Sequence, residues 1–227
     1  MIGIIGAMKI ETDGLISALS NKQEFAYKSY RMVKGVLFGR DVVVCECGIG
    51  KVNSSTATML MKQVFDVDTV INIGVAGGYK TLKQGDIVIA TNTVEHDYDA
   101  RPDGLEIGQV HGFSSPYLDC DSEIVQKLSN IANEKGYSFK VGTVVSGDQF
   151  IASNDKSEYL TKTFGALAYD MESGAINHVC KLLGIKFTAI RAISDNGNDD
   201  AIDSFYTFVE KASKKSIDLV SEFIARA

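Results

Sequence analysis

Three acidic residues, Glu11, Glu172 and Asp195, each follow an apolar run of the sequence. Arg191 is close enough to Asp195 along the chain to orient one of these carboxylates. The sequence shows no nucleophile triad, because Ser146 lacks an elbow motif and no histidine is placed to act as its base. Paired carboxylates without a metal or a nucleophile suit acid–base hydrolysis of a glycosidic bond.

Two of the acidic residues, taken alone, also have a purely structural explanation. Glu172 in a first helical turn would complement the helix dipole. Ser194 and Asp195 after a strand have the composition of a helix cap. The chemical interpretation therefore depends on the combination of several carboxylates at strand ends.

Two glycine-rich segments resemble nucleotide-binding motifs without matching them. Residues 3–6 lack the spacing of a dinucleotide fingerprint, and residues 48–51 end like a P-loop. In that P-loop alignment, Cys45 stands at the first glycine and Val52 stands where Ser or Thr must bind magnesium. The four cysteines and three histidines have no metal-type spacing. We expect neither a metal nor a cofactor.

The elements that must position these residues alternate between strand-like and helix-like patterns. Continuous apolar runs, typical of strands buried on both faces, occur at Ile2–Ile5, Val42–Cys45, Val70–Ile73, Ile87–Ala90, Gly142–Val145 and Phe187–Ile190. One helix is predicted around 124–132 with a stop at Gly136, and the last helix is predicted to start near Asp203 or Ser204.

This alternation predicts an α/β fold. We expect a three-layer α/β/α architecture whose central twisted sheet is mixed but largely parallel. The antiparallel part is expected from the hairpin of Arg31–Leu37 and Asp41–Cys47. No composition break marks a boundary, so residues 1–227 are expected to form one domain.

Five polar or glycine-rich turns are expected directly after strands. Ligands of α/β sheets bind at the carboxyl ends of strands, so these turns predict one composite pocket. They are Gly6-Ala7-Met8, Gly48-Ile49-Gly50-Lys51, Gly74-Val75-Ala76-Gly77-Gly78, Ser146-Gly147-Asp148 and Ser194-Asp195.

The amino-acid composition restricts the kinds of partner that this protein can bind. The 227 residues carry a formal net charge of -6, which argues against binding to nucleic acid or to anionic membranes. No stretch approaches the length of a transmembrane helix, and the N-terminal segment has no signal-peptide pattern. We expect a soluble, cytoplasmic protein with reduced cysteines whose ligand is a small molecule.

The order and spacing of several segments closely resemble the 5′-methylthioadenosine/S-adenosylhomocysteine nucleosidases of the nucleoside phosphorylase superfamily. The resemblance runs through nearly the whole chain. Its carrying segments are 2–8, 48–52, 74–78, 85–87, 146–151, 171–172 and 191–195. The resemblance implies adenine release from 5′-methylthioadenosine and S-adenosylhomocysteine in methionine salvage, with water as the nucleophile.

The resemblance also implies a role for each matching residue. Asp195 matches the general acid that protonates N7 of adenine, and Ser194 matches its hydrogen-bonding neighbour. Glu11 matches the base that activates water, and Arg191 matches the partner that orients this base. The residues matching the nucleoside-binding set are Glu172 and the Met171 backbone at the ribose hydroxyls, Phe150 and Ile151 at adenine, Met8, Ile49 and Phe205 as apolar walls, and Val75, Ala76 and Gly77 in the glycine-rich turn.

The family pattern further implies a homodimer in which the segment Asp97–His111 lies near the partner's site. This sequence departs from the pattern there, because Arg101, Asp103 and His111 make a mostly apolar segment polar. Such a lid would suit a charged homocysteine tail, 5′-deoxyadenosine or another adenine nucleoside. A second departure is Val75, which replaces a common serine and removes one polar contact.

Two alternatives remain open at this point. One is a purine nucleoside phosphorylase of the same superfamily, and the other is a non-catalytic nucleoside-binding protein with this fold. Phosphorolysis needs cations to hold phosphate. Asn72 and Val75 stand where phosphorylases carry more suitable side chains, and Lys51 and Arg191 are the nearby cations. Water is therefore favoured as the nucleophile.

Overall fold

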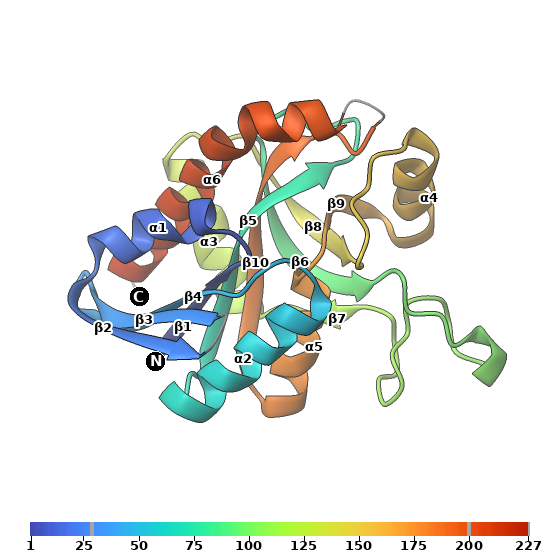
Figure 1. The fold of residues 1–227 in the computed structure, drawn as a ribbon. Coiled ribbons are helices and arrows are strands. Elements are labelled where there is room, and N and C mark those ends of the chain that lie inside the picture. The colour runs from blue at the N-terminus through green and yellow to red at the C-terminus, as the bar shows by residue number, and fades with distance from the viewer. Residues whose placement is uncertain (28–29, 199–200, 227) are drawn as a thin grey trace.

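A computed structural model describes residues 1–27, 30–198 and 201–226, with the backbone alone for residues 203, 204 and 207. Strands and helices alternate along the chain, as the sequence patterns predict (Figure 1). The elements are β1 (Ile2–Gly6), α1 (Lys9–Ala18), β2 (Ser20–Tyr27), β3 (Tyr30–Leu37), β4 (Arg40–Glu46), α2 (Lys51–Phe65), β5 (Thr69–Gly78), β6 (Ile87–Glu95), η1 (Arg101–Asp103), β7 (Leu118–Asp119), α3 (Ser122–Glu134), β8 (Phe139–Ser146), α4 (Asn154–Phe164), β9 (Ala166–Asp170), α5 (Ser173–Leu183), β10 (Lys186–Asp195) and α6 (Ala201–Arg226).

All six predicted apolar runs lie inside strands. Several boundaries differ from the sequence-based expectation. Ser146, Ser194 and Asp195, expected in turns after strands, are the last residues of β8 and β10. The segment Gly74–Gly78 is the last part of β5 instead of a turn after it, because its backbone pairs with β10 and β9. The last helix begins at Ala201, before the predicted start at Asp203 or Ser204, whose side chains lie outside the described residues.

The described strands form one mixed sheet that curls back on itself. Parallel pairings join β4, β1, β5 and β10, and a second parallel group joins β6, β8 and β9. The two groups meet through antiparallel pairs, β10 with β6 and β5 with β9, so these five strands close into a ring. The mixed sheet is confirmed, and the predicted hairpin is β3–β4.

The β5–β9 pairing decides where the site forms. It is confined to Gly77 opposite Tyr169 and Gly78 opposite Ala168, at the carboxyl ends of both strands. Although these strands run in opposite directions, their ends therefore meet at one point. The end of β10 joins them, since Asp195 pairs with Gly77.

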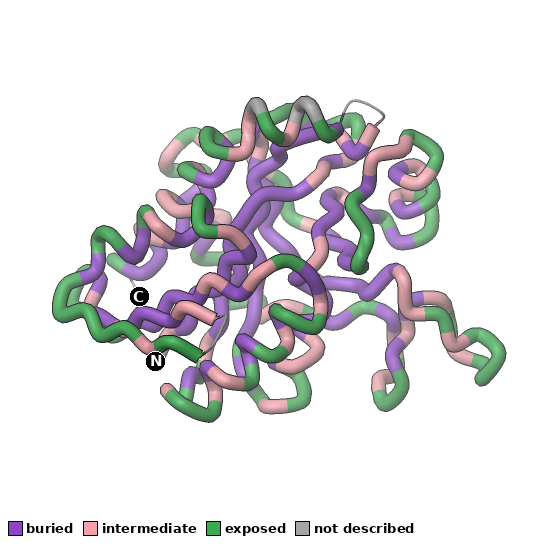
Figure 2. Tube along the Cα trace, viewed as in Figure 1, coloured by how far each residue is buried: buried purple, intermediate pink, exposed green. Residues whose placement is uncertain are grey.

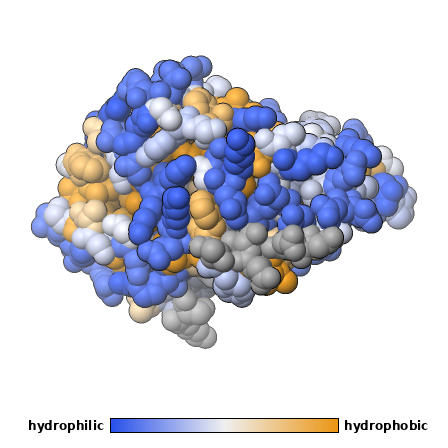
Figure 3. Space-filling model, turned by 90° about the horizontal axis from the view of Figure 1, so that it is seen from above, coloured by the Kyte–Doolittle hydropathy of each residue, from blue (hydrophilic) through white to orange (hydrophobic). Residues whose placement is uncertain are grey.

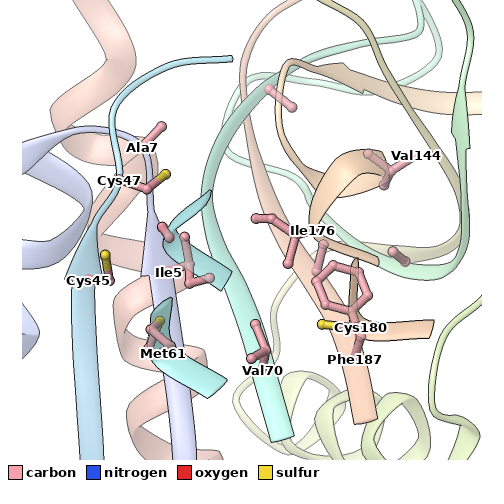
Figure 4. Packing of buried hydrophobic residues seen from close by; sticks show 14 of the residues in the cluster. Ile5, Ala7, Cys45, Cys47, Met61, Val70, Val144, Ile176, Cys180 and Phe187 are labelled. Atoms are coloured by element: carbon pink, nitrogen blue, oxygen red, sulfur yellow. The ribbon is translucent and has the colours of Figure 1, made fainter. Parts of the chain in front are cut away.

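Helices cover both faces of the sheet, which gives the expected three layers (Figure 1). Helices α1, α3 and α6 pack together on one face through residues such as Leu15, Leu128 and Leu219. Helices α2 and α5 cover the other face, where Met61 and Cys180 lie among buried strand residues (Figure 4). Buried residues accordingly run through the centre of the molecule, and exposed residues lie along the outer parts of the trace (Figure 2).

One segment departs from this layered body. Residues 97–111, with the short helix η1, extend away from the sheet (green in Figure 1).

The molecule seen from above shows a largely hydrophilic surface with hydrophobic clusters among it (Figure 3). Within the described residues, the helices are too short or too polar to cross a membrane.

Candidate active site

A pocket of about 570 Å³ opens where β1, β5, β9 and β10 end. This volume includes space that is open to solvent. It is lined by Ala7, Met8, Glu11, Ile49, Val75, Ala76, Gly77, Gln149, Phe150, Ile151, Tyr169, Asp170, Met171, Glu172, Ser194, Asp195 and Phe205.

Glu11 is buried in the first turn of α1 and points back towards the end of β1. Its Oε2 accepts hydrogen bonds from the N–H groups of Ala7 (2.8 Å) and Met8 (2.9 Å), and its Oε1 accepts one from Val75 N–H (3.0 Å). Burial raises the pKa of Glu11, while the charge of Arg191 and these three N–H groups oppose that rise. The carboxylate is therefore held rigidly, with donors that favour its ionised form.

Arg191 lies behind the pocket wall in the middle of β10 and is 1% exposed. Its Nε donates to Asp170 Oδ2 at 2.7 Å, and its Nη2 donates to Ser173 Oγ at 3.0 Å and to Asn72 Oδ1. The expectation that Arg191 orients Glu11 needs refinement, since its hydrogen bonds go to these other residues. It acts on Glu11 through its charge.

Gly74 explains how Glu11 and Arg191 can approach each other. A Cβ atom added at Gly74 would overlap both Arg191 Nη1 and Glu11 Oε1. The bare backbone of β5 thus lets a buried cation face a buried carboxylate.

Glu172 links β9 to α5 and is also buried. Its Oε1 accepts a hydrogen bond from Gly50 N–H at 2.9 Å, and its Oε2 lies 3.8 Å from Arg191 Nη2. Burial and the neighbouring carboxylate of Asp170 raise the pKa of Glu172 to about 7, against the opposing charge of Arg191. One cation is thus shared among several acidic groups.

Asp195, at the end of β10, has a different environment. Its Oδ2 accepts a hydrogen bond from Ser194 Oγ and its Oδ1 accepts one from Gly197 N–H, both at 2.9 Å. Burial raises its pKa above the ordinary value, and only these two hydrogen bonds oppose that rise. The causes that act on Asp195 include no cation, whereas Glu11 faces the charge of Arg191, so the two carboxylates lie in different electrostatic environments.

The rest of the pocket is mostly apolar. Phe150 and Phe205 meet edge to face, with ring centroids 5.8 Å apart. Val75 and Phe205 pack in a small cluster with Met8 and Ala192. Ile49 and Phe150 remain 53% and 48% exposed at the pocket mouth. A flat aromatic or apolar ligand group would cover these side chains.

The structure gathers nearly all the residues singled out from the sequence. Arg191 alone among them stands outside the lining, directly behind it. The lining residues that were singled out are Glu11, Asp195, Ser194, Glu172, Met171, Phe150, Ile151, Val75, Ala76, Gly77, Met8, Ile49 and Phe205.

Sequence reasoning missed Asp170 as a site residue. It accepts hydrogen bonds from the hydroxyls of Ser146 and Ser173, and it pairs with Arg191. The available signal was an acidic residue at a strand end, two positions before Glu172. Three further residues line the pocket. Ala7 and Gln149 directly precede Met8 and Phe150 in the chain, and Tyr169 pairs with Gly77 across the sheet.

The pocket lining does not include the extended segment, and the described residues provide no metal site. Residues 97–111 contribute nothing to its described lining. Among the residues that the structure describes, no group of three or more His, Cys, Asp or Glu side chains could hold a metal ion.

Comparisons with known proteins agree with this architecture. A model of the phosphorylase superfamily matches residues 1–225. The chain is 35% identical over 228 residues to a 5′-methylthioadenosine/S-adenosylhomocysteine nucleosidase of Staphylococcus aureus (strain JH9), covering 100% of both chains.

Solved structures show the same relationship. A Neisseria meningitidis 5′-methylthioadenosine/S-adenosylhomocysteine nucleosidase, in complex with methylthio-immucillin-A, is similar with a TM-score of 0.97 and 34% identity, over 100% of this chain and 99% of that one. The futalosine hydrolase of Helicobacter pylori is similar with a TM-score of 0.95 and 32% identity, over 100% of this chain and 97% of that one. This chain therefore belongs to the phosphorylase superfamily and, within it, to the 5′-methylthioadenosine/S-adenosylhomocysteine nucleosidase family.

Proposed function

We propose that this protein hydrolyses the N-glycosidic bond of adenine nucleosides such as 5′-methylthioadenosine and S-adenosylhomocysteine, and releases adenine. The observation that carries the proposal is the pair of buried carboxylates, Glu11 and Asp195, which line one pocket in unlike environments. Glu11 has three N–H donors and a nearby cation, whereas Asp195 has one N–H donor and one hydroxyl. Such a difference separates a base from an acid.

The reaction follows from this assignment. Protonated Asp195 donates its proton to N7 of adenine, so the electrons of the breaking C1′–N9 bond pass into a neutral base. Ionised Glu11 accepts a proton from water while the water oxygen bonds to C1′. The products are adenine and the free sugar. Each proton transfer is worth roughly 10²- to 10⁴-fold in rate.

The acidic wall of the pocket suits the transition state. Positive charge builds up on the sugar as the glycosidic bond breaks. Glu11, Asp170 and Glu172 lie along this side with Arg191 as their shared cation, so the wall is negative overall when they are ionised. Fixed negative groups beside a developing cation lower its energy. Glu172 and the Met171 backbone are proposed to hold the ribose hydroxyls, with Phe150 and Ile151 at adenine.

Water is favoured over phosphate as the nucleophile. The described lining contains no Lys, Arg or His. Lys51 is bound to Glu95 (3.1 Å) and Asp97 (2.7 Å), and Arg191 is bound to Asp170. The N–H groups at the start of α2, a common anion site, already donate to carboxylates. A phosphate dianion would find no free cation among the described residues of this site.

We further propose a homodimer in which residues 97–111 of one protomer lie near the partner's pocket. The segment extends away from its own body, and the pocket mouth leaves Ile49 and Phe150 exposed. Val52 is also 75% exposed on α2. Sedimentation would report the oligomeric state. A cytoplasmic role in methionine salvage is part of the same proposal.

The test is adenine release from 5′-methylthioadenosine, S-adenosylhomocysteine, 5′-deoxyadenosine and adenosine, each with and without phosphate. We expect release without phosphate, with a free sugar as the second product. Release that requires phosphate and yields a sugar phosphate would establish the phosphorylase alternative. Tight adenine binding with no release from any substrate would instead support a nucleoside-binding protein. The ranking of substrates identifies the 5′ group accepted.

A further inference from the structure

A continuous set of polar contacts runs from the base of the 97–111 segment to Glu172 in the pocket wall. Its last contact is the hydrogen bond from Gly50 N–H to Glu172 Oε1, at 2.9 Å. The next residue, Lys51, donates its own N–H to Asp148 Oδ1 at 2.8 Å. Asp148 in turn donates its N–H to Asp97 Oδ2 at 3.0 Å. Two adjacent N–H groups of one turn thus have different acceptors. Gly50 N–H donates to Glu172, and Lys51 N–H donates to Asp148.

The side chain of Lys51 closes this set into a loop. Its Nζ lies 2.7 Å from Asp97 Oδ1 and 3.1 Å from Glu95 Oε2. The other oxygen of Glu95 lies 2.8 Å from His178 Nδ1 on α5. Lys51 and Asp97 are each less than one-fifth exposed, so water screens this ion pair less than a surface pair. The start of α2 is therefore connected to β6 and to α5.

Gly50 permits the close approach that this arrangement needs. Its φ is +100°, a backbone conformation that residues with a side chain rarely adopt. A Cβ added at Gly50 would lie 3.0 Å from Asp148 Oδ1. The N–H of Gly50 can therefore face Glu172 while Asp148 lies against the same turn.

We propose that Asp148, Asp97 and Lys51 are positioning residues that hold Gly50 N–H against Glu172 and thereby set the affinity for the ribose of the substrate. The inference rests on the proposed function, in which Glu172 holds the ribose hydroxyls. None of the three lies in the pocket lining. They act through the backbone turn 48–51, which carries the only N–H donor that the structure shows on Glu172 within the described residues.

Asp148 offers the cleanest variant, because its side chain is exposed and its loss leaves no cavity in the core. Asp148→Ala removes the acceptor of Lys51 N–H, whereas Asp148→Asn keeps an acceptor oxygen. Lys51→Met breaks the ion pairs, and Lys62→Met is the matched control on the same helix, where Lys62 pairs with Asp66. Circular dichroism and thermal unfolding would show that each variant is folded.

The readout separates ribose recognition from general damage. For Asp148→Ala and Lys51→Met, we expect KM for 5′-methylthioadenosine to rise about tenfold, the size expected for weakening one hydrogen bond to a charged group. The dissociation constant of free adenine should stay within about twofold, because adenine lacks the ribose. Asp148→Asn should recover most of the wild-type KM, and Lys62→Met should match the wild type.

Two results would overturn the inference. One is an unchanged KM in folded Asp148→Ala and Lys51→Met proteins. The other is an equal loss of affinity for adenine and for the nucleoside, which would show a general structural role. Amide hydrogen exchange at Gly50 and Lys51 tests the turn without any substrate, and Asp148→Ala should accelerate it. If the wild type released no adenine, the proposed function would be wrong. The hydrogen-exchange measurement would still test whether Asp148 holds the turn, because it needs no substrate.

Discussion

Arg191 Nε lies 2.7 Å from Asp170 Oδ2, and the two side chains are each 1% exposed. Asp170 also accepts hydrogen bonds from the hydroxyls of Ser146 and Ser173. This buried ion pair fixes the position of the guanidinium. The distance of its positive charge from Glu11 and Glu172 is therefore constant. The pair thus sets the electrostatic balance of the pocket from behind its wall.

Replacement of Asp170 tests this balance. Asp170→Asn should lower the free energy of unfolding by about 3–5 kcal/mol, the usual cost of removing one partner from a buried pair. It should also lower the pKa of Glu172, because a neighbouring negative charge that raises it is lost. Urea unfolding and the pH dependence of kcat/KM are the measurements. Asp13→Asn, at an exposed ion pair on α1, is the control. An unchanged unfolding free energy would contradict the importance of the pair.

Asp195→Asn should leave nucleoside binding largely intact and lower kcat by about 10²- to 10⁴-fold. The amide still accepts the hydrogen bond from Gly197 N–H but cannot supply an acidic proton at neutral pH. Calorimetry of nucleoside binding and a single-turnover adenine assay separate the two effects. Turnover at the wild-type rate would exclude Asp195 as the acid.

Glu11→Gln should also abolish most hydrolysis, for a different reason. The amide oxygen can replace one acceptor, but the side chain can no longer remove a proton from water. In the wild type, the acid limb of the pH–rate profile should reflect protonation of a base whose pKa is raised by burial. Loss of that limb in a variant with residual activity would support the assignment, and an unchanged profile would argue against it.

Glu172 should make stability depend on pH in a defined direction. Its pKa is about 7 in the folded protein against 4.5 for a free glutamate side chain. A raised folded-state pKa favours folding at low pH, and that contribution is lost as the pH rises from the lower value through the higher one. Glu172→Gln should therefore raise the melting temperature relative to wild type more at about pH 8 than at about pH 5. Equal differences at both pH values would show that Glu172 titrates normally.

Val75→Ser tests the departure from the family pattern. The backbone N–H of Val75, and not its side chain, holds Glu11. We therefore expect kcat within about threefold of wild type and a loss of about 1 kcal/mol in unfolding free energy from the removed methyl groups. Val75→Ala, which also loses methyl groups but adds no hydroxyl, is the matched comparison. A large gain in kcat for serine alone would show that valine limits the reaction.

Local sequence patterns were sufficient for much of the architecture. Apolar runs predicted the buried strands, because strands covered on both faces exclude polar side chains. The hairpin between β3 and β4 and the end of α3 near Gly136 also followed from short-range signals. The resemblance of the spaced motifs to a known family then assembled Glu11, Glu172 and Asp195 into one expected site.

The sequence by itself determined which residue types meet at the strand ends, and with them the acid–base chemistry. Only the tertiary structure decided how their charges are balanced. Arg191 pairs with Asp170, and Glu172 is held by Gly50 from 122 positions away in the chain. Such partners depend on sheet closure and on the paths of separate loops. These are set by the packing of the whole chain, so no local pattern encodes them.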